Sequence, residues 1–137
     1  MTGYSGTPLP RKLGINTRCR LGLAKAPENF QATLGALPDG ITITDAARGK
    51  GPFDVIVAFT TTEAELAAAF ARLAPKLAQA GALWIAWPKK SSPIATVLSD
   101  GVVRRTGLAT ERLVDNKVCA VDDVWSALRF VVRLSHR

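Results

Sequence analysis

An unbroken apolar run at residues 82–87, Ala-Leu-Trp-Ile-Ala-Trp, constrains the fold more than any other feature of the sequence. Such a run is typical of a central parallel strand that is buried on both faces. Periodicity alone also allows a short buried helix, but the two tryptophans, the isoleucine and the flanking Gly81 and Pro88 favour a strand. Pro88 has no N–H to donate to a strand ladder, so we expect the strand to end there.

Other strand patterns alternate with helical patterns along the chain. Strands are predicted at residues 19–24, 41–44, 54–59, 117–121 and 127–133. Helices are predicted at residues 8–13, 27–34, 63–80, 93–98 and 99–108. In the third helix Thr62 and Glu65 form a predicted capping box, Pro75 should kink or shorten the helix, and Gly81 should end it. Ser92 is the expected cap of the fourth.

This alternation predicts a three-layer α/β fold, with a mostly parallel sheet of about six strands and helices on both faces. Only residues 122–126 separate the last two predicted strands, whereas a parallel crossover takes a dozen or more, so these strands should form an antiparallel hairpin. A wound sheet that ends in this way resembles the class I methyltransferase variant of the Rossmann fold, which implies the strand order 2-1-3-4-6-5. We expect residues 1–137 to form a single Rossmann-like domain, with residues 1–14 as an N-terminal arm and short helix.

The 137 residues carry 18 Lys and Arg against 11 Asp and Glu, a formal net charge of +7. This balance indicates either a solvated basic surface, which we favour, or an anionic partner such as a phosphate, a nucleotide or nucleic acid.

No apolar run approaches the ~18–20 residues that span a bilayer, so no membrane partner is expected. Cys19 and Cys119 lie in apolar runs, so we expect both to be buried, reduced thiols. Reduced thiols and the lack of an apolar N-terminal segment together predict a cytoplasmic protein.

Several kinds of chemistry lack the residues that they need. Glycines normally follow the first strand of a nucleotide-binding fold, but residues 24–27 are Ala-Lys-Ala-Pro. Asp45, at the end of the second predicted strand, either binds a ribose or closes a turn, and we favour the turn. His136 is the sole histidine, and Cys19 and Cys119 lack zinc spacing. We therefore expect no metal, no cofactor and no catalytic residue, and the sequence leans towards a protein that is not an enzyme.

One cluster of chemically useful side chains remains. If the fifth strand is parallel to the fourth, its carboxyl end brings Asp122 to the same edge of the sheet as Lys89. The candidate ligand-binding residues at this edge are Lys25, Thr60, Lys89, Lys90, Ser91, Asp122, Trp125 and Ser126. They could form an anion site with Trp125 as a stacking wall. Alternatively, Lys89 pairs with Asp122 or Asp123 and Trp125 seals the core, an arrangement that we favour because ion pairs between loops are common.

Two motifs, LWIAWPKKSS at residues 83–92 and LVDNKVCAVD at residues 113–122, followed by Trp125-Ser126, resemble a bacterial family classed as a domain of unknown function. The resemblance covers nearly the whole chain and implies a Rossmann-like fold and a cytosolic bacterial origin. It adds Trp87, Pro88, Asp115 and Lys117 to the candidate residues without giving them a catalytic role. Asp115 and Lys117 should lie at the start of the fifth strand, away from the crevice, where we expect a structural ion pair.

The sequence thus favours a small Rossmann-like domain that binds an anionic ligand or a protein partner without catalysis. The first alternative is a degenerate S-adenosylmethionine-dependent methyltransferase, or another nucleotide-using transferase, with Lys89 and Asp122 in its site. The second alternative is a basic nucleic-acid accessory protein, for which the support is weaker. The sequence does not decide the oligomeric state.

Overall fold

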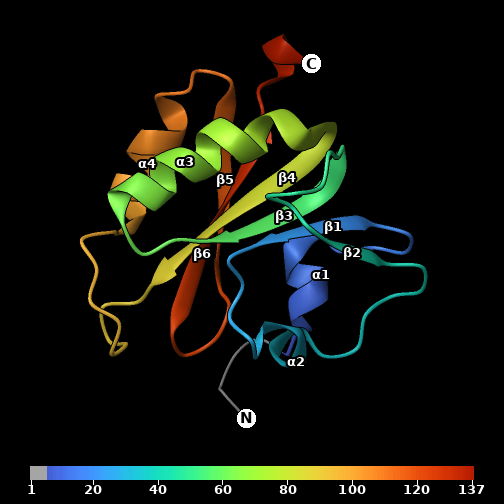
Figure 1. Cartoon of the computed structure of the whole chain (residues 1–137), viewed down its shortest axis with the longest axis horizontal. Coiled ribbons are helices and arrows are strands. Elements are labelled where there is room, and N and C mark those ends of the chain that lie inside the picture. Colours follow the sequence, from blue (N-terminus) through green and yellow to red (C-terminus); the bar gives the residue numbers. More distant parts are fainter. Residues whose placement is uncertain (1–5) are drawn as a thin grey trace.

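Figure 1 shows the computed structural model, which describes residues 6–137. In this part of the chain six strands form one sheet in the order β2-β1-β3-β4-β6-β5, which confirms the predicted order. The strands are β1 (Arg20–Ala24), β2 (Thr42–Asp45), β3 (Phe53–Phe59), β4 (Leu77–Pro88), β5 (Leu113–Ala120) and β6 (Trp125–Val132). Strands β1 to β4 are mutually parallel, and β6 is antiparallel to both β4 and β5. Strand β5 therefore points in the same direction as β4.

Helices cover both faces of the sheet (Figure 1). The helices are α1 (Leu9–Leu13), α2 (Phe30–Leu34), α3 (Glu63–Leu73) and α4 (Asp100–Leu108), with 3-10 turns η1 (Ala74–Lys76) and η2 (Leu134–His136). One hydrophobic core lies between the sheet and the pair α3 and α4, and the other lies between the sheet and the pair α1 and α2. The predicted arm falls mainly on residues 1–5, outside the described residues, whereas the predicted short helix is confirmed as α1.

Strand β4 contributes to both cores, as its unbroken apolar run predicts. Leu83 and Ile85 face α3 and α4, whereas Trp84 and Ala86 face α1 and α2. The indole Nε1 of Trp84 donates a hydrogen bond to the carbonyl oxygen of Leu13 at 3.0 Å. Because a buried N–H without an acceptor costs about 1–3 kcal/mol, this bond holds α1 against the middle of the sheet.

The boundary between α3 and β4 differs from the prediction. Helix α3 ends at Leu73, and residues 77–80, which we expected to be helical, belong to β4. Pro75 causes the difference, since its ring clashes with the preceding turn and only the 3-10 turn η1 follows α3. Gly81 does not end a helix. A Cβ there would lie 2.9 Å from the carbonyl oxygens of Phe53 and Asp54, where the register of β3 and β4 shifts.

The helix predicted at residues 93–98 is also absent, and the chain between β4 and α4 is a loop. Side chains rather than helical bonds hold this loop in place. The hydroxyl of Thr96 donates to the carbonyl oxygen of Thr61 at 2.7 Å and accepts from the backbone N–H of Leu98 at 3.1 Å. Helix α4 then begins as expected, with the Ser99 hydroxyl accepting from the backbone N–H of Val102.

Strands β5 and β6 are both longer than predicted. Strand β5 begins at Leu113, so Asp115 and Lys117 lie within it, and Trp125 and Ser126 belong to β6 rather than to the preceding loop. Asp115 does form an ion pair, but its partner is Arg104 of α4, with 2.8 Å between Arg104 Nε and Asp115 Oδ2. Cys19 and Cys119 are buried and free, as expected. Over residues 6–137 the structure contains no helix of the length and apolar character that a membrane span requires.

Two glycines of α4 provide a test of how tightly this helix packs. A Cβ on Gly107 would run into the ring of Phe130, whereas a Cβ on Gly101 would meet nothing closer than 3.7 Å. Gly107→Ala should lower the free energy of unfolding by about 1–3 kcal/mol because of overpacking. Gly101→Ala should leave it unchanged or raise it by up to about 1 kcal/mol, since alanine favours the helix. Urea unfolding of both variants measures the difference, and equal effects would contradict the packing of Phe130 beneath α4.

Candidate functional site

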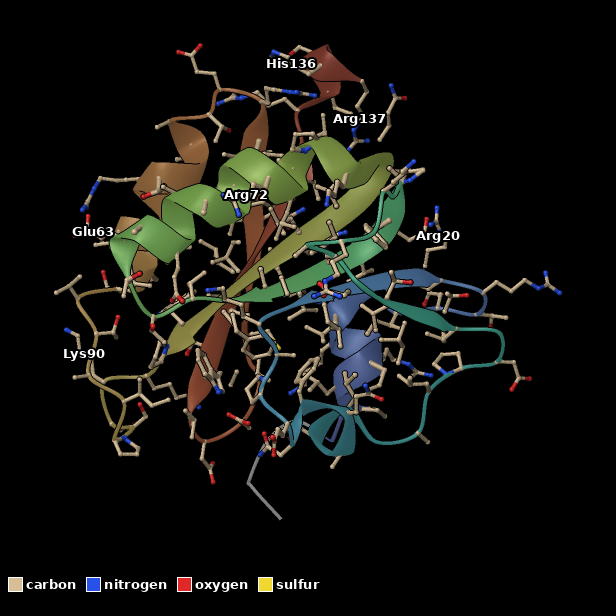
Figure 2. All side chains as sticks on the ribbon, in the orientation of Figure 1. Arg20, Glu63, Arg72, Lys90, His136 and Arg137 are labelled. Carbon is tan, nitrogen blue, oxygen red and sulfur yellow. The ribbon has the colours of Figure 1, made fainter. Side chains whose placement is uncertain are left out.

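The carboxyl ends of β4 and β5 meet at one edge of the sheet, as the sequence predicts. The backbone N–H of Lys89, which follows β4, donates to the carbonyl oxygen of Val124 in the β5–β6 hairpin at 2.7 Å. The loop that carries Lys89, Lys90 and Ser91 and the turn that carries Asp122 therefore lie side by side. Lys90 is exposed and lies on the outer part of its loop (Figure 2).

Within the hairpin, Asp122 stabilises the turn. Its Oδ1 accepts hydrogen bonds from the backbone N–H groups of Val124 at 2.8 Å and Trp125 at 2.9 Å. This is the turn role that is common for aspartate at such positions. The Trp125 side chain is only 9% exposed and packs edge-on against Phe59, with 5.0 Å between the ring centroids. Trp125 is thus part of the core, and Ser126 lies opposite Trp87 in the ladder.

Thr60 lies deeper at the same edge, where β3 ends. It is 2% exposed, and both its backbone N–H and its hydroxyl donate to the carbonyl oxygen of Ala86 at 2.9 Å. The backbone bond continues the ladder between β3 and β4 beyond the last residue of β3, and the hydroxyl adds a second bond to the same carbonyl oxygen. The two donors of Thr60 are therefore engaged in hydrogen bonds within the sheet, at the end of β3.

A hollow of about 290 Å³ opens beside these residues, between α3 and the carboxyl ends of β1 and β3. Strands β1 and β3 are neighbours from which the chain leaves in opposite directions, towards β2 and towards β4. This is the topological switch point, the place where open α/β sheets bind ligands. The walls of this switch-point hollow are mostly apolar and include Ala24, Ala58, Ala64, Ala68, Ala69 and Leu73.

Two of the predicted site residues, Lys25 and Thr60, line the switch-point hollow. The others lie on the loop after β4 or on the β5–β6 hairpin. Sequence reasoning missed Glu65 and the alanines of α3. The spacing of the alanines could have indicated this wall, since Ala64 and Ala68 lie four residues apart and therefore share one face of the helix.

Lys25 and Glu65 both line the hollow and contact each other. Lys25 Nζ lies 3.0 Å from Glu65 Oε2, and the other carboxylate oxygen accepts from the backbone N–H of Thr61 at 2.8 Å and from the Thr61 hydroxyl at 2.9 Å. The predicted capping box is thus formed in part. The Thr62 hydroxyl accepts from the backbone N–H of Glu65, but the Glu65 carboxylate reaches Thr61 instead of Thr62.

These contacts determine the charge of Glu65. The backbone N–H of Thr61, followed by the Lys25 ammonium and the Thr61 hydroxyl, lowers the pKa of Glu65 to about 2. The carboxylate is therefore ionised at neutral pH and is a weak base. Lys25 itself has a φ of 55°, in the left-handed region that glycine adopts most readily. The turn after β1 thus has a backbone conformation suited to glycine, with a lysine in that position.

Asp45, the candidate ribose ligand at the end of β2, closes the turn that follows it. Its Oδ1 accepts from the backbone N–H of Ala47 at 2.9 Å, and its Oδ2 lies 3.9 Å from Arg48 Nε. The turn interpretation that the sequence favoured matches these contacts. Among residues 6–137 no three His, Cys, Asp or Glu side chains are grouped so that they could hold a metal ion.

Comparison with solved structures gives the class of the fold. The chain is similar to DhpI in complex with SAH, at 12% identity and a TM-score of 0.59, over 91% of this chain and 82% of that one. It is also similar to a TehB-like SAM-dependent methyltransferase from Corynebacterium glutamicum, at 10% identity and a TM-score of 0.55, over 96% and 90% of the two chains. A third similar structure is magnesium protoporphyrin IX methyltransferase from Synechocystis with bound SAH, at 11% identity and a TM-score of 0.55, over 91% and 78%.

The chain therefore has a Rossmann-like fold of the methyltransferase type. No protein-family model matches the sequence, and no curated protein matches it. The resemblance to the bacterial family of unknown function stays a prediction.

The hydrogen bonds of Glu65 predict a pH effect on stability. The folded pKa is lowered from 4.5 to about 2, so the stabilisation is fully present above about pH 5 and is lost as the pH falls towards 2. Glu65→Gln should lower the free energy of unfolding at pH 7 by about 1–2 kcal/mol, because charged hydrogen bonds are lost, and this difference should shrink towards pH 2. Chemical unfolding from pH 2 to pH 7 measures it.

Glu63→Gln is the matched control, since Glu63 is exposed in the same helical turn (Figure 2). It should leave the pH profile of stability close to that of the unchanged protein. A Glu65→Gln variant whose profile matches that of Glu63→Gln would contradict the role of the Thr61 and Lys25 contacts.

Proposed function

We propose that this chain is a methyltransferase-like domain that binds S-adenosylmethionine, or its product S-adenosylhomocysteine, in the switch-point hollow. The observation that carries the proposal is the position of the hollow at the carboxyl ends of β1 and β3, where the strand order reverses. The similar structures with bound SAH support the same type of ligand.

The residues around the hollow fit an adenosyl group. Its volume of about 290 Å³ is at the lower end of the range of small-molecule sites, and its apolar walls suit an adenine ring. Ala58, Ala68 and Leu73 would contact the ring. Glu65, which is held ionised, would accept hydrogen bonds from ribose hydroxyls or from the ligand's amino group.

The contact between Lys25 and Glu65 lies in the lining of the hollow, and it is a weak one. The Lys25 side chain is 68% exposed, and ion pairs of such residues are worth only about 0–1 kcal/mol. A ligand can therefore displace the lysine at little cost. The glycine loop that usually approaches such a ligand is replaced here by residues 24–27, so contacts from α3 and β3 would supply more of the binding.

When bound, S-adenosylmethionine supplies an electrophilic methyl group. The chain's own part would be to bind and orient the ligand and to exclude water with the alanine-lined wall of α3. Glu65 is too weak a base to deprotonate an acceptor at neutral pH, since its pKa is about 2. This favours acceptors that are already nucleophilic, such as an amine or a thiolate.

The sequence favoured a non-catalytic domain for an anion or a protein partner. The mostly apolar walls of the switch-point hollow suit an adenosyl ligand better than a small anion, and the similar structures support the methyltransferase alternative. The turn role of Asp122 and the buried position of Trp125 also leave the anion site around Lys89 with fewer groups to form it.

Isothermal titration calorimetry with S-adenosylmethionine and S-adenosylhomocysteine tests the proposal. Ala68→Leu fills the hollow from α3 and should weaken binding at least tenfold, which corresponds to about 1.4 kcal/mol. Ala67→Leu adds the same bulk to the neighbouring residue, which lines the groove between α3 and α4, and should leave binding unchanged. Thermal unfolding checks that both variants are folded. An absence of binding by the unchanged protein at millimolar ligand, or equal weakening by both variants, would refute the proposal.

A further inference from the structure

A second region that is hollowed and lined by cations lies on the opposite face of the sheet, beside α1. Lys117 of β5 and Arg129 of β6 are directly opposite each other in the antiparallel ladder, so their side chains project from the same face. Their neighbours Cys119 and Ala127 belong to the core that includes residues of α1 and α2. Lys117 and Arg129 therefore lie on the face that α1 covers in part.

A hollow of about 380 Å³ lies between α1 and β5 on this face. Three of its lining residues are cations, namely Arg11 and Lys12 of α1 and Lys117 of β5. The other described residues that line it are neutral: Thr7, Val118, Cys119 and Ala120. This is a lining that attracts anions.

A neighbouring hollow of about 390 Å³ lies below the C-terminal end of α1 and includes Arg18 and Arg129. It also contains one carboxylate, that of Asp54, whose Oδ2 accepts a hydrogen bond from the backbone N–H of Arg20. The two hollows share α1 as a border, and the Lys117–Arg129 neighbours connect them. Together these residues form a cationic band, which consists of Arg11, Lys12, Arg18, Lys117 and Arg129.

The band brings like charges close together. Like charges directly opposite in a ladder destabilise a sheet, and Lys117 and Arg129 are such a pair. Burial, and after it the charge of Arg137, lowers the pKa of Arg129. The Arg129 side chain donates a hydrogen bond to the neutral Asn116 Oδ1 at 3.1 Å. An anionic partner would relieve this repulsion.

Charge also accumulates around Cys119. Burial raises the pKa of this thiol, while the charges of Lys12, Lys117 and Lys89 act in the opposite direction. Three ammonium groups from α1, β5 and the loop after β4 are thus close enough to act on one thiol.

We infer that the cationic band binds the sugar–phosphate backbone of a nucleic acid. The five cations come from α1, β5, β6 and the turn before β1, and they are spread over two adjoining hollows instead of converging on one point. A spread of this kind suits a chain of phosphates better than a single small anion. The formal net charge of +7 adds long-range attraction for the same partner. The inference does not depend on the proposed adenosyl ligand, because the switch-point hollow lies on the α3 face.

Fluorescence anisotropy with a labelled, mixed-sequence, single-stranded RNA of about 20 nucleotides tests the inference across a salt series. The unchanged protein should bind, and the logarithm of its affinity should fall linearly with the logarithm of the salt concentration. The triple variant Arg11→Gln, Lys12→Gln, Lys117→Gln should lose at least tenfold in affinity and should show a salt slope that is smaller by roughly 2.

The matched control is the triple variant Arg48→Gln, Lys50→Gln, Arg105→Gln, which removes the same number of charges from exposed positions elsewhere. It should keep most of the affinity and most of the salt slope. If the first triple variant does not fold, Lys117→Glu alone, at an exposed position of the edge strand, should still weaken binding several-fold.

No RNA binding by the unchanged protein at low salt would overturn the inference, and so would equal losses in the two triple variants. The Ala68→Leu variant should bind RNA normally, which separates this result from that for the adenosyl ligand. Failure of one proposal therefore leaves the other intact.

Discussion

The burial of β4 on both faces is the constraint on which the rest of the structure depends. Its side chains alternate between two cores, so helices must cover the sheet on both sides. The indole N–H of Trp84 would be unpaired in this position without the carbonyl oxygen of Leu13, 71 residues away in the chain. That one bond places α1 on its face of the sheet, and with α1 the cations Arg11 and Lys12.

The two faces carry different chemistry because different helices cover them. On one face, α3 presents alanines to the carboxyl ends of β1 and β3, and the small side chains leave a mostly apolar hollow whose charged lining residues are Lys25, Glu65 and Arg72. On the other face, α1 is a short helix, and the cations of β5 and β6 lie in or beside open hollows. The sheet therefore separates the switch-point hollow, where we propose an adenosyl ligand, from the cationic band, where we propose a nucleic acid.

The loop after β4 and the turn after β5 were predicted from the sequence to lie at one edge of the sheet, and the structure confirms that the two lie side by side. Because β4 and β5 were predicted to be parallel, the residues that follow them, Lys89 and Asp122, were expected at the same edge. The hydrogen bond from the Lys89 backbone N–H to the carbonyl oxygen of Val124 confirms that the two segments are close. Trp125 packs against Phe59 in the core, as in the arrangement that the sequence favoured, although its strand begins earlier than its pattern indicated. Lys25 forms its ion pair with Glu65, which is 40 residues away in the chain. Local sequence patterns do not predict a contact between residues so far apart.

By itself, the sequence determined the hairpin at the end of the sheet, the central position of the tryptophan-rich strand, the N-terminal cap of α3 and the start of α4. Its resemblance to the methyltransferase variant of the Rossmann fold implied the strand order. The hairpin, the central strand and the helix starts follow from local periodicity, from loop length and from capping and proline chemistry, all of which act over a few residues. Only the tertiary structure decided that residues 77–80 join β4, that residues 93–98 form a loop, and that Asp115 pairs with Arg104. It also decided which cations share a face. Such features depend on contacts between distant segments, whose energies are set by packing and register and not by neighbouring residues in the chain.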